Sequence, residues 1–75
     1  MLINVKTISG KKISLSFEPT EKISDIKKFL AEKEGIPASF FILTYIGKTL
    51  KDELTIEEAK IVPNNLLMMK LPLKG

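Results

Sequence analysis

The chain contains no cysteine, histidine, tryptophan or arginine among its 75 residues. Without cysteine it can form neither a disulfide nor a thiolate metal site. Without histidine as well, it lacks the commonest general base, the thiol nucleophile and the usual zinc ligands. Arginine is the side chain that recognises guanine edges in nucleic acids with two hydrogen bonds, and this chain has none. Its net charge of +3 is spread over lysines, which is typical of a solvated surface and not of a nucleic-acid-binding patch. We therefore expect no enzyme activity, no cofactor or metal, and no nucleic-acid partner.

Three further features are missing from the sequence. No apolar run approaches the roughly 20 residues that a membrane-spanning helix needs, so we expect no membrane partner. The glycines lie singly and form no phosphate-binding loop, and the pairs Asp52-Glu53 and Glu57-Glu58 are typical of solvated surface. The first residues alternate like a strand and unlike a signal peptide, which favours an intracellular protein of the cytoplasm or nucleus.

The residues that are present predict a β-hairpin at the start of the chain. Residues 1–7 alternate between apolar and polar side chains, and residues 12–17 alternate again after a turn around Gly10. Such period-two patterns are typical of strands with one buried face. The inward-facing set is expected to be Met1, Ile3, Val5, Ile13, Leu15 and Phe17.

One helix is predicted over residues 23–34. Ile23, Ile26 and Leu30, with Phe29, have the spacing of a buried helical stripe. Lys22, directly before this segment, is a poor N-cap. We therefore expect Thr20 to cap a helix that begins slightly earlier. At the other end, Gly35 suits a left-handed helix cap, and Pro37 cannot continue a helix.

The rest of the chain predicts three more strands. They cover residues 40–45, 48–50 and 66–71, with a turn at residues 63–65. Thr55 and Glu58 have capping-box spacing and predict one helical turn over residues 54–59. The helix supplies the crossover that a parallel pair needs, so the first and last strands are expected to pair in parallel. The sequence thus indicates one α+β domain with a single helix across a mixed sheet.

The strands also carry apolar residues on the side away from the predicted core. With only one helix, that face of the sheet should meet solvent, and a cluster of apolar side chains there would indicate a protein-binding surface. The alternative is scattered, individually exposed apolar residues. The members of this outward set are Ile8, Phe40, Ile42, Leu66 and Met68.

Residues along the whole chain resemble the ubiquitin family. The block Lys33-Glu34-Gly35-Ile36-Pro37 carries much of the resemblance. The resemblance implies an α+β domain of the β-grasp fold over residues 1–72, with a mixed four- to five-stranded sheet and one helix packed across it. A flexible tail over residues 73–75 is expected to follow. The other matching positions are Met1, Ile3, Val5-Lys6-Thr7, Gly10-Lys11, Ile13, Leu15, Glu18-Pro19, Ile23, Lys27, Leu43, Gly47-Lys48, Leu50, Asp52, Thr55, Ile61, Leu67, Leu71 and Leu73.

The resemblance also implies a place for partner binding. Thr44 stands where ubiquitin has the isoleucine at the centre of its recognition patch, and Lys70 stands where it has a valine. We therefore predict weak or absent binding to ordinary ubiquitin-binding domains. A second family patch keeps its apolar character. The expected partner-binding residues from both patches are Ile8, Ile36, Ile42, Thr44, Gly47, Lys48, Met68, Lys70, Leu71 and Leu73.

The C-terminal residues leave two functions open. Family modifiers end in Leu-Arg-Leu-Arg-Gly-Gly and join lysines through the last glycine, whereas this chain ends in Leu71-Pro72-Leu73-Lys74-Gly75. The first interpretation is a monomeric, non-conjugated interaction module of a larger protein, with ubiquitin-pathway or scaffold proteins as partners. The alternative is a modifier conjugated through Gly75, or a glycine just beyond it, with Lys48 as an acceptor for chains.

Overall fold

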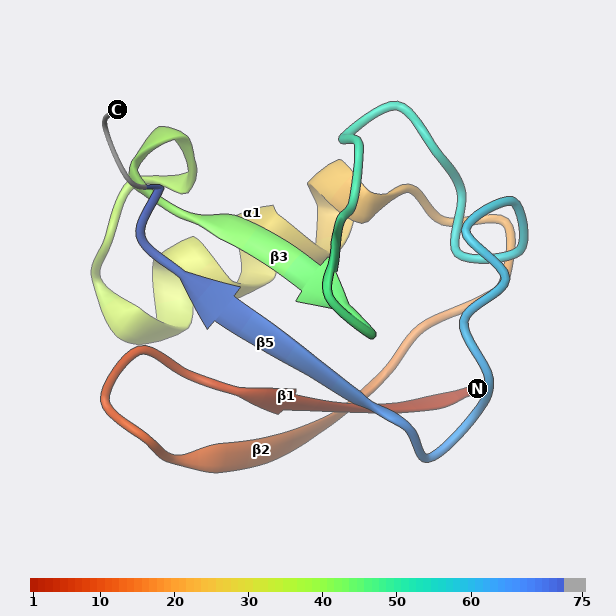
Figure 1. The fold of residues 1–75 in the computed structure, drawn as a ribbon, viewed down its shortest axis with the longest axis horizontal. Coiled ribbons are helices and arrows are strands. Elements are labelled where there is room, and N and C mark those ends of the chain that lie inside the picture. Colours follow the sequence, from red (N-terminus) through yellow and green to blue (C-terminus); the bar gives the residue numbers. More distant parts are fainter. Residues whose placement is uncertain (73–75) are drawn as a thin grey trace.

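The computed structural model describes residues 1–72 of the chain, so the predicted tail lies outside the described residues. In this part five strands form one mixed sheet in the order β2-β1-β5-β3-β4, and one α-helix crosses its inner face (Figure 1). This is the predicted β-grasp fold. In chain order the elements are β1 (Leu2–Lys6), β2 (Lys12–Ser16), α1 (Ile23–Glu34), the 3₁₀-helix η1 (Ala38–Phe40), β3 (Ile42–Tyr45), β4 (Lys48–Thr49) and β5 (Leu66–Lys70).

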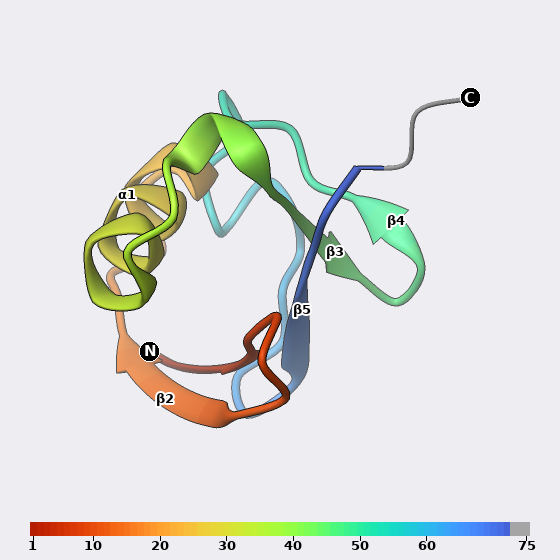
Figure 2. The same cartoon turned by 90° about the vertical axis from the view of Figure 1, so that its left-hand side faces the viewer.

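The last strand lies at the centre of the sheet. β5 pairs in parallel with β1, with Val5 opposite Leu67, and antiparallel with β3, with Leu43 opposite Met69. The predicted parallel pairing of the first and last strands is confirmed. The sheet curls around α1 when seen end-on, which leaves its outer face uncovered by the helix (Figure 2).

The start of α1 is held by a loop from later in the chain. The N–H groups of Ile23 and Ser24 donate to the carbonyl oxygens of Leu54 and Asp52, at 2.8 and 3.2 Å. These bonds satisfy backbone donors that have no partner within the helix. The N-cap is Lys22, whose own N–H donates to the Asp25 carboxylate at 3.0 Å. The prediction of Thr20 as the cap is therefore wrong, because tertiary contacts and Asp25 replace a capping hydroxyl.

The end of α1 agrees with the sequence prediction. Gly35 takes the left-handed conformation, with φ of 71°, and the N–H groups of Gly35 and Ile36 both donate to the Ala31 carbonyl oxygen. Glycine adopts this conformation without a Cβ clash, so the helix ends there. Pro37 then leads into η1, where the Phe40 N–H donates to the Pro37 carbonyl oxygen.

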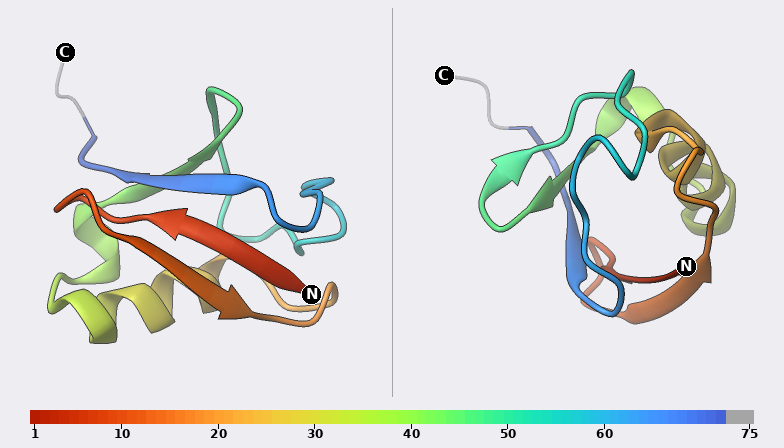
Figure 3. Two further views of the ribbon diagram at one scale, coloured as in Figure 1. Left: turned by 90° about the horizontal axis from the view of Figure 1, so that it is seen from below. Right: turned by 90° about the vertical axis from the view of Figure 1, so that its right-hand side faces the viewer.

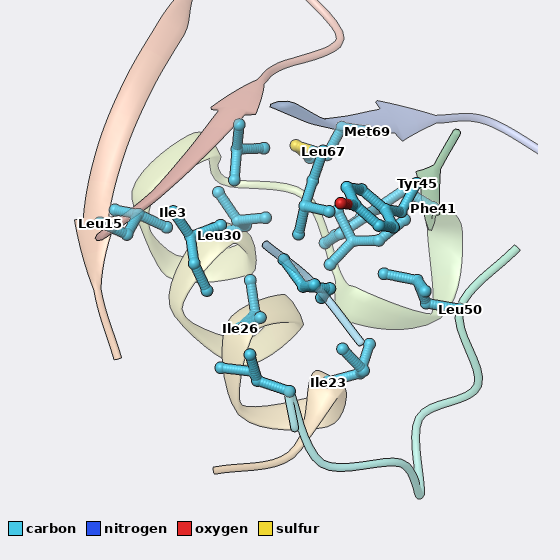
Figure 4. Close-up of a cluster of buried hydrophobic side chains, with 14 residues drawn as sticks. Ile3, Leu15, Ile23, Ile26, Leu30, Phe41, Tyr45, Leu50, Leu67 and Met69 are labelled. Carbon is cyan, nitrogen blue, oxygen red and sulfur yellow. The ribbon is translucent and has the colours of Figure 1, made fainter. Parts of the chain in front are cut away.

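The core lies between α1 and the inner face of the sheet (Figure 4). The helix contributes Ile23, Ile26 and Leu30, as predicted, and Leu67 on the central strand is completely buried. Phe29 was predicted to join this stripe, but 44% of it is exposed. It lies at the side of the helix and meets Phe17 edge to face, with ring centroids 6.1 Å apart. The remaining buried apolar residues are Ile3, Val5, Leu15, Phe41, Leu43, Tyr45, Leu50, Ile56, Ile61 and Met69.

Each strand is one or two residues shorter than predicted at one or both ends, and the third and last strands show why. Phe40 belongs to η1 rather than to the third strand, because the turn started by Pro37 continues through it. The last strand ends at Lys70, one residue before its predicted end, and Leu71 is exposed. The predicted capping box is present: Thr55 and Glu58 exchange side-chain to backbone hydrogen bonds of 2.9 and 3.0 Å. They close a single turn, in which the Ala59 N–H donates to the Thr55 carbonyl oxygen.

Candidate protein-binding face

The outer face of the sheet carries a row of residues from all five strands of the described part. Lys12 lies opposite Lys6 on β1, Lys6 lies beside Met68 on β5, and Met68 lies opposite Thr44 on β3. Thr44 in turn pairs with Thr49 on the edge strand β4. Directly opposed residues in neighbouring strands share a face. The register therefore places Met68 at the middle of the outer face, between a lysine and a threonine.

The position predicted to centre the binding patch offers little surface. Thr44 is only 7% exposed, because Met68 and Thr49 flank it on both sides. Ile42 and Met68 are half-buried, and Ile8, in the turn after β1, is 38% exposed. The structure thus leaves partial apolar surface on both sides of Thr44 and little at Thr44 itself.

Polar residues interrupt the apolar set on this face. Lys70 is opposite Ile42, and Asn4 is beside Leu66. The Asn4 side chain accepts a hydrogen bond from the Ser14 hydroxyl at 2.7 Å, and its amide donates to the Asn64 carbonyl oxygen at 3.1 Å. The predicted outward residues therefore do not merge into one continuous apolar patch. Phe40, the remaining member, lies outside the sheet in η1.

Charge is strongly segregated between the sheet and the rest of the chain. The five strands contain Lys6, Lys12, Lys48 and Lys70, all exposed, and no acidic residue. All nine carboxylates of the sequence lie between Glu18 and Glu58, outside the strands. Lys6 and Lys12 are directly opposite one another, an arrangement in which like charges repel. The strands therefore present a cationic surface suited to acidic groups.

The turn between β3 and β4 holds a residue that the sequence analysis did not single out. Ile46 has φ of 51°, Gly47 has φ of 77°, and Ile46 is 79% exposed. Positive φ at both central residues is typical of a tight hairpin turn, where Asn-Gly is the favoured pair. A signal was present in the sequence: residues 46 and 47, between the strands predicted over residues 40–45 and 48–50, are isoleucine and glycine, so isoleucine stands where a turn-forming residue is usual.

The remaining predicted site residues lie at two other places. Lys48 is exposed on β4, directly after the turn, and Ile36 is half-buried between α1 and η1, where it packs against the core. Leu71 follows β5 with 57% of its surface exposed, and Pro72 is exposed as well. Leu73 and Gly75, the proposed conjugation site, lie outside the described residues.

Lysines of the described part differ in accessibility. Lys27, one of the positions shared with ubiquitin, is buried: its Nζ lies 3.0 Å from Asp52 Oδ1 and 5.8 Å from the centre of the Phe41 ring. Lys48 is free of such contacts within residues 1–72. An amine buried in an ion pair cannot reach a carbonyl group of another protein. The amine of Lys48 is therefore accessible to such a group, whereas the amine of Lys27 is not.

The described part shows neither a metal-binding cluster nor a spanning helix. Within residues 1–72, no three or more acidic side chains converge as metal ligands would. The single α-helix of this part, α1, is too short and too polar to cross a bilayer.

Comparison with known proteins gives consistent matches over the whole fold. The sequence model described as "Ubiquitin family" matches residues 3–74. Ubiquitin-like protein 1 of Schizosaccharomyces pombe is 43% identical over 75 residues, which cover all of this chain and 96% of that protein. NEDD8-like protein RUB1 of Saccharomyces cerevisiae is 40% identical over 75 residues, covering all of this chain and 97% of RUB1. Ubiquitin-like protein NEDD8 of Dictyostelium discoideum is 43% identical, with the same coverage.

Proposed function

Because the chain belongs to the ubiquitin family, we propose that it is a conjugatable modifier of the NEDD8-like type. Its C-terminal carboxyl group, at Gly75 or a glycine just beyond it, would form an isopeptide bond with the amine of a lysine on a target protein. The condensation formally releases water, and its free energy comes from cleavage of a nucleoside triphosphate, which separate activating enzymes couple to the reaction by transferring the carboxyl oxygen to a phosphate group. The chain itself needs no catalytic residue for this role.

The observation that carries the proposal is the set of relatives. Three proteins named NEDD8 or NEDD8-like are 39–43% identical to this chain and are matched over 96–97% of their own length. This supports the modifier over the non-conjugated module of a larger protein, which the sequence alone placed first.

The structure supports the proposal at Leu71 and Pro72, the two residues that follow β5. β5 ends at Lys70, and the next two residues, Leu71 and Pro72, are exposed instead of packed against the core. The chain therefore leaves the sheet at a point where an enzyme can reach it. Pro72 has no N–H and cannot extend the ladder of β5, which favours an early exit from the sheet.

The test uses the natively encoded protein in cells of the source organism, with an epitope tag at the N-terminus. A matched variant is truncated after Pro72. On a denaturing, reducing gel we expect heavier bands that collapse with a deconjugating protease and are absent for the truncated variant. One heavy band of fixed mass, insensitive to the protease and independent of the tail, would instead identify a domain of a larger protein.

The charge segregation of the sheet favours a second role, non-covalent docking of proteins on the outer face. Apolar contact at Ile8, Ile42 and Met68 would form the centre of the interface, and Lys48 and Lys70 a polar rim. Met68→Asp places a carboxylate between Lys6 and Thr44 and should remove bound partners. If Met68→Asp and Ile42→Asp both left every cellular partner bound, this face would not be the interface.

A further inference from the structure

We propose that Ser14, on the outer face of β2, is a phosphorylation site, and that the added phosphate is held between Lys12 and Lys6. The modifying enzyme would be a protein kinase that selects serines preceded by lysines, and a nucleoside triphosphate would supply the phosphoryl group. This site goes beyond the proposed function and does not depend on it, because a free modifier and a domain of a larger protein would present β2 in the same way.

The residues before Ser14 are basic. Lys11 and Lys12 stand three and two residues before it, and no other serine or threonine of the chain has lysines at both of these positions. Protein kinases select substrates by the charges around the acceptor hydroxyl, and one large class of serine kinases recognises basic residues at these two positions. Ser16, two residues later, has an isoleucine and a serine there instead. The sequence therefore distinguishes Ser14 from Ser16.

The Ser14 side chain is accessible in the folded protein. It lies at the middle of β2, the outermost strand at one edge of the sheet, drawn in orange beside β1 (Figure 3). Its neighbours Ile13 and Leu15 pack toward the core, so the exposed Ser14 side chain lies on the outer face, away from α1. A strand already has the extended shape in which peptide segments lie along a binding cleft. A kinase can therefore reach this hydroxyl without unfolding the sheet.

Two lysines lie close enough to Ser14 to hold a phosphate there. Ser14 is directly opposite Asn4, and Lys12 is directly opposite Lys6. Lys12 therefore lies two residues from Ser14 on the same face of β2, and Lys6 is the diagonal neighbour of Ser14 on β1. Long side chains span both separations. The strands of the described part carry no acidic residue that would compete for these ammonium groups.

Backbone hydrogen bonds show that the two lysines form a close pair. One residue beyond them, the Thr7 N–H donates to the Lys11 carbonyl oxygen at 2.7 Å. Hydrogen-bonded and non-hydrogen-bonded pairs alternate along antiparallel strands, so Lys6 and Lys12 form a non-hydrogen-bonded pair, the kind with the shorter separation. Their charges repel one another. A phosphate on Ser14, with a charge of about −2, would compensate both.

The phosphoryl transfer needs only the nucleoside triphosphate and the kinase. A bond forms between Ser14 Oγ and the γ-phosphorus, and the bond from that phosphorus to the oxygen bridging it to the β-phosphate breaks. The hydroxyl proton passes to a base of the kinase, and the nucleoside diphosphate leaves.

Phosphorylation would also change the hydrogen bonds of Asn4. The Ser14 hydroxyl now donates to Asn4 Oδ1 at 2.7 Å, and the Asn4 amide donates to the Asn64 carbonyl oxygen at 3.1 Å. A phosphate dianion accepts hydrogen bonds and has no proton to donate. The Asn4 side chain must then turn its amide toward the phosphate and release the Asn64 carbonyl oxygen. The modification would thus alter the turn that precedes β5.

The first experiment tests whether the folded protein is a substrate. The natively encoded protein and a synthetic peptide of residues 8–20 are each incubated with magnesium-ATP and the catalytic subunit of cyclic-AMP-dependent protein kinase. Mass spectrometry should find phosphate on Ser14 and none on Ser16 in both. Modification of the peptide alone, of neither substrate, or mainly at Ser16 would overturn the proposal.

A pair of double variants tests the basic residues. Replacing Lys11 and Lys12 with glutamine should slow phosphorylation of the folded protein about tenfold, because the kinase loses the charges that it recognises. The matched control, Lys28→Gln with Lys60→Gln, removes the same charge from exposed positions elsewhere and should leave the rate unchanged. Equal rates for the two double variants would show that Lys11 and Lys12 do not direct the kinase to Ser14.

The second experiment tests whether Lys6 holds the phosphate. Phosphorus NMR of the Ser14-phosphorylated protein gives the second pKa of the phosphate. Nearby ammonium groups favour its doubly charged form, so this pKa should lie below that of the phosphorylated peptide of residues 8–20, which lacks Lys6. Lys6→Gln should raise the pKa toward the peptide value, and Lys60→Gln should leave it unchanged. The same pKa in protein and peptide would overturn the phosphate site between the lysines.

The third experiment tests whether the site is used. Protein isolated from cells of the source organism, with phosphatases inhibited, should contain peptides phosphorylated at Ser14. A Ser14→Ala variant should lose this phosphate, and Ser16→Ala should keep it. Absence of phosphate at Ser14 in cells would overturn the proposal. The gel test of conjugation depends on the tail, so its result is independent of this one.

Discussion

Lys27 of α1 forms an ion pair with Asp52, in the loop after β4, with Lys27 Nζ 3.0 Å from Asp52 Oδ1. The lysine side chain is 11% exposed and the aspartate 54%. The carbonyl oxygen of the same aspartate also accepts a hydrogen bond from the Ser24 N–H of α1. One residue in the loop after β4 therefore neutralises a buried amine and satisfies a backbone donor of the helix.

Replacing Asp52 with asparagine should destabilise the fold by about 1–3 kcal/mol. The lysine amine would remain buried without a charged partner, and the exposure of Asp52 moderates the loss. Urea denaturation followed by circular dichroism measures the free energy of unfolding. Lys27→Met, which fills the same space without a charge, should cost less. An unchanged urea midpoint for Asp52→Asn would show that the pair contributes nothing to stability.

Lys27 should be the least reactive lysine of the described part toward an amine-acetylating reagent. Its amine becomes available only when the structure opens locally, so we expect acetylation about tenfold or more slower than at Lys48. Mass spectrometry of peptides after short reaction times gives the rate at each site. The Asp52→Asn variant should label faster at Lys27, while its Lys48 rate serves as the internal control. Equal rates at the two lysines in the unchanged protein would contradict the buried ion pair.

Tyr45→Phe should cost about 1–2 kcal/mol of stability. The phenol oxygen accepts hydrogen bonds from the Val62 N–H at 3.2 Å and from the Asn65 side-chain amide at 2.7 Å. Phenylalanine keeps the buried ring but leaves both donors without this acceptor. In a double-mutant cycle, Asn65→Ala should cost less in the Tyr45→Phe background than alone. Additive losses would mean that the two side chains do not interact.

Phe17 and Phe29 should be coupled energetically. Their rings meet edge to face at an interplanar angle of 88°. Such pairs contribute about 0.5–1.5 kcal/mol beyond the apolar area that they bury. A cycle of Phe17→Leu, Phe29→Leu and the double variant, measured by urea denaturation, should give a coupling in this range. A coupling near zero would indicate that Phe29 is only an exposed side chain.

Local signals in the sequence predicted the elements that depend on neighbouring residues. The helix limits at Ile23 and Glu34 are those predicted, because the stop at Gly35 and Pro37 lies within a few residues of the helix end. The parallel pairing of β1 and β5 followed from the presence of a single crossover helix.

Properties set by distant residues could not be predicted in this way. Thr44 is covered by Met68, 24 residues further along the chain, and Lys27 is neutralised by Asp52, 25 residues further along. Phe29 shares the helical spacing of the core stripe, but its direction places it at the edge, beside Phe17. The sequence places an isoleucine before Gly47, where a turn-forming residue is usual, but alternation does not predict how exposed a turn residue is, so the 79% exposure of Ile46 is known only from the structure.

The central position of β5 has a consequence for how the protein is made. Among the strands of the described residues, β5 is the last to leave a ribosome, yet both β1 and β3 hydrogen-bond to it. Until residues 66–70 emerge, the β1–β2 and β3–β4 hairpins have no strand between them, and a lone hairpin is at best marginally stable in water. A nascent chain stalled before residue 66 should therefore remain unfolded and open to proteases, and this domain should begin to fold only after β5 has been synthesised.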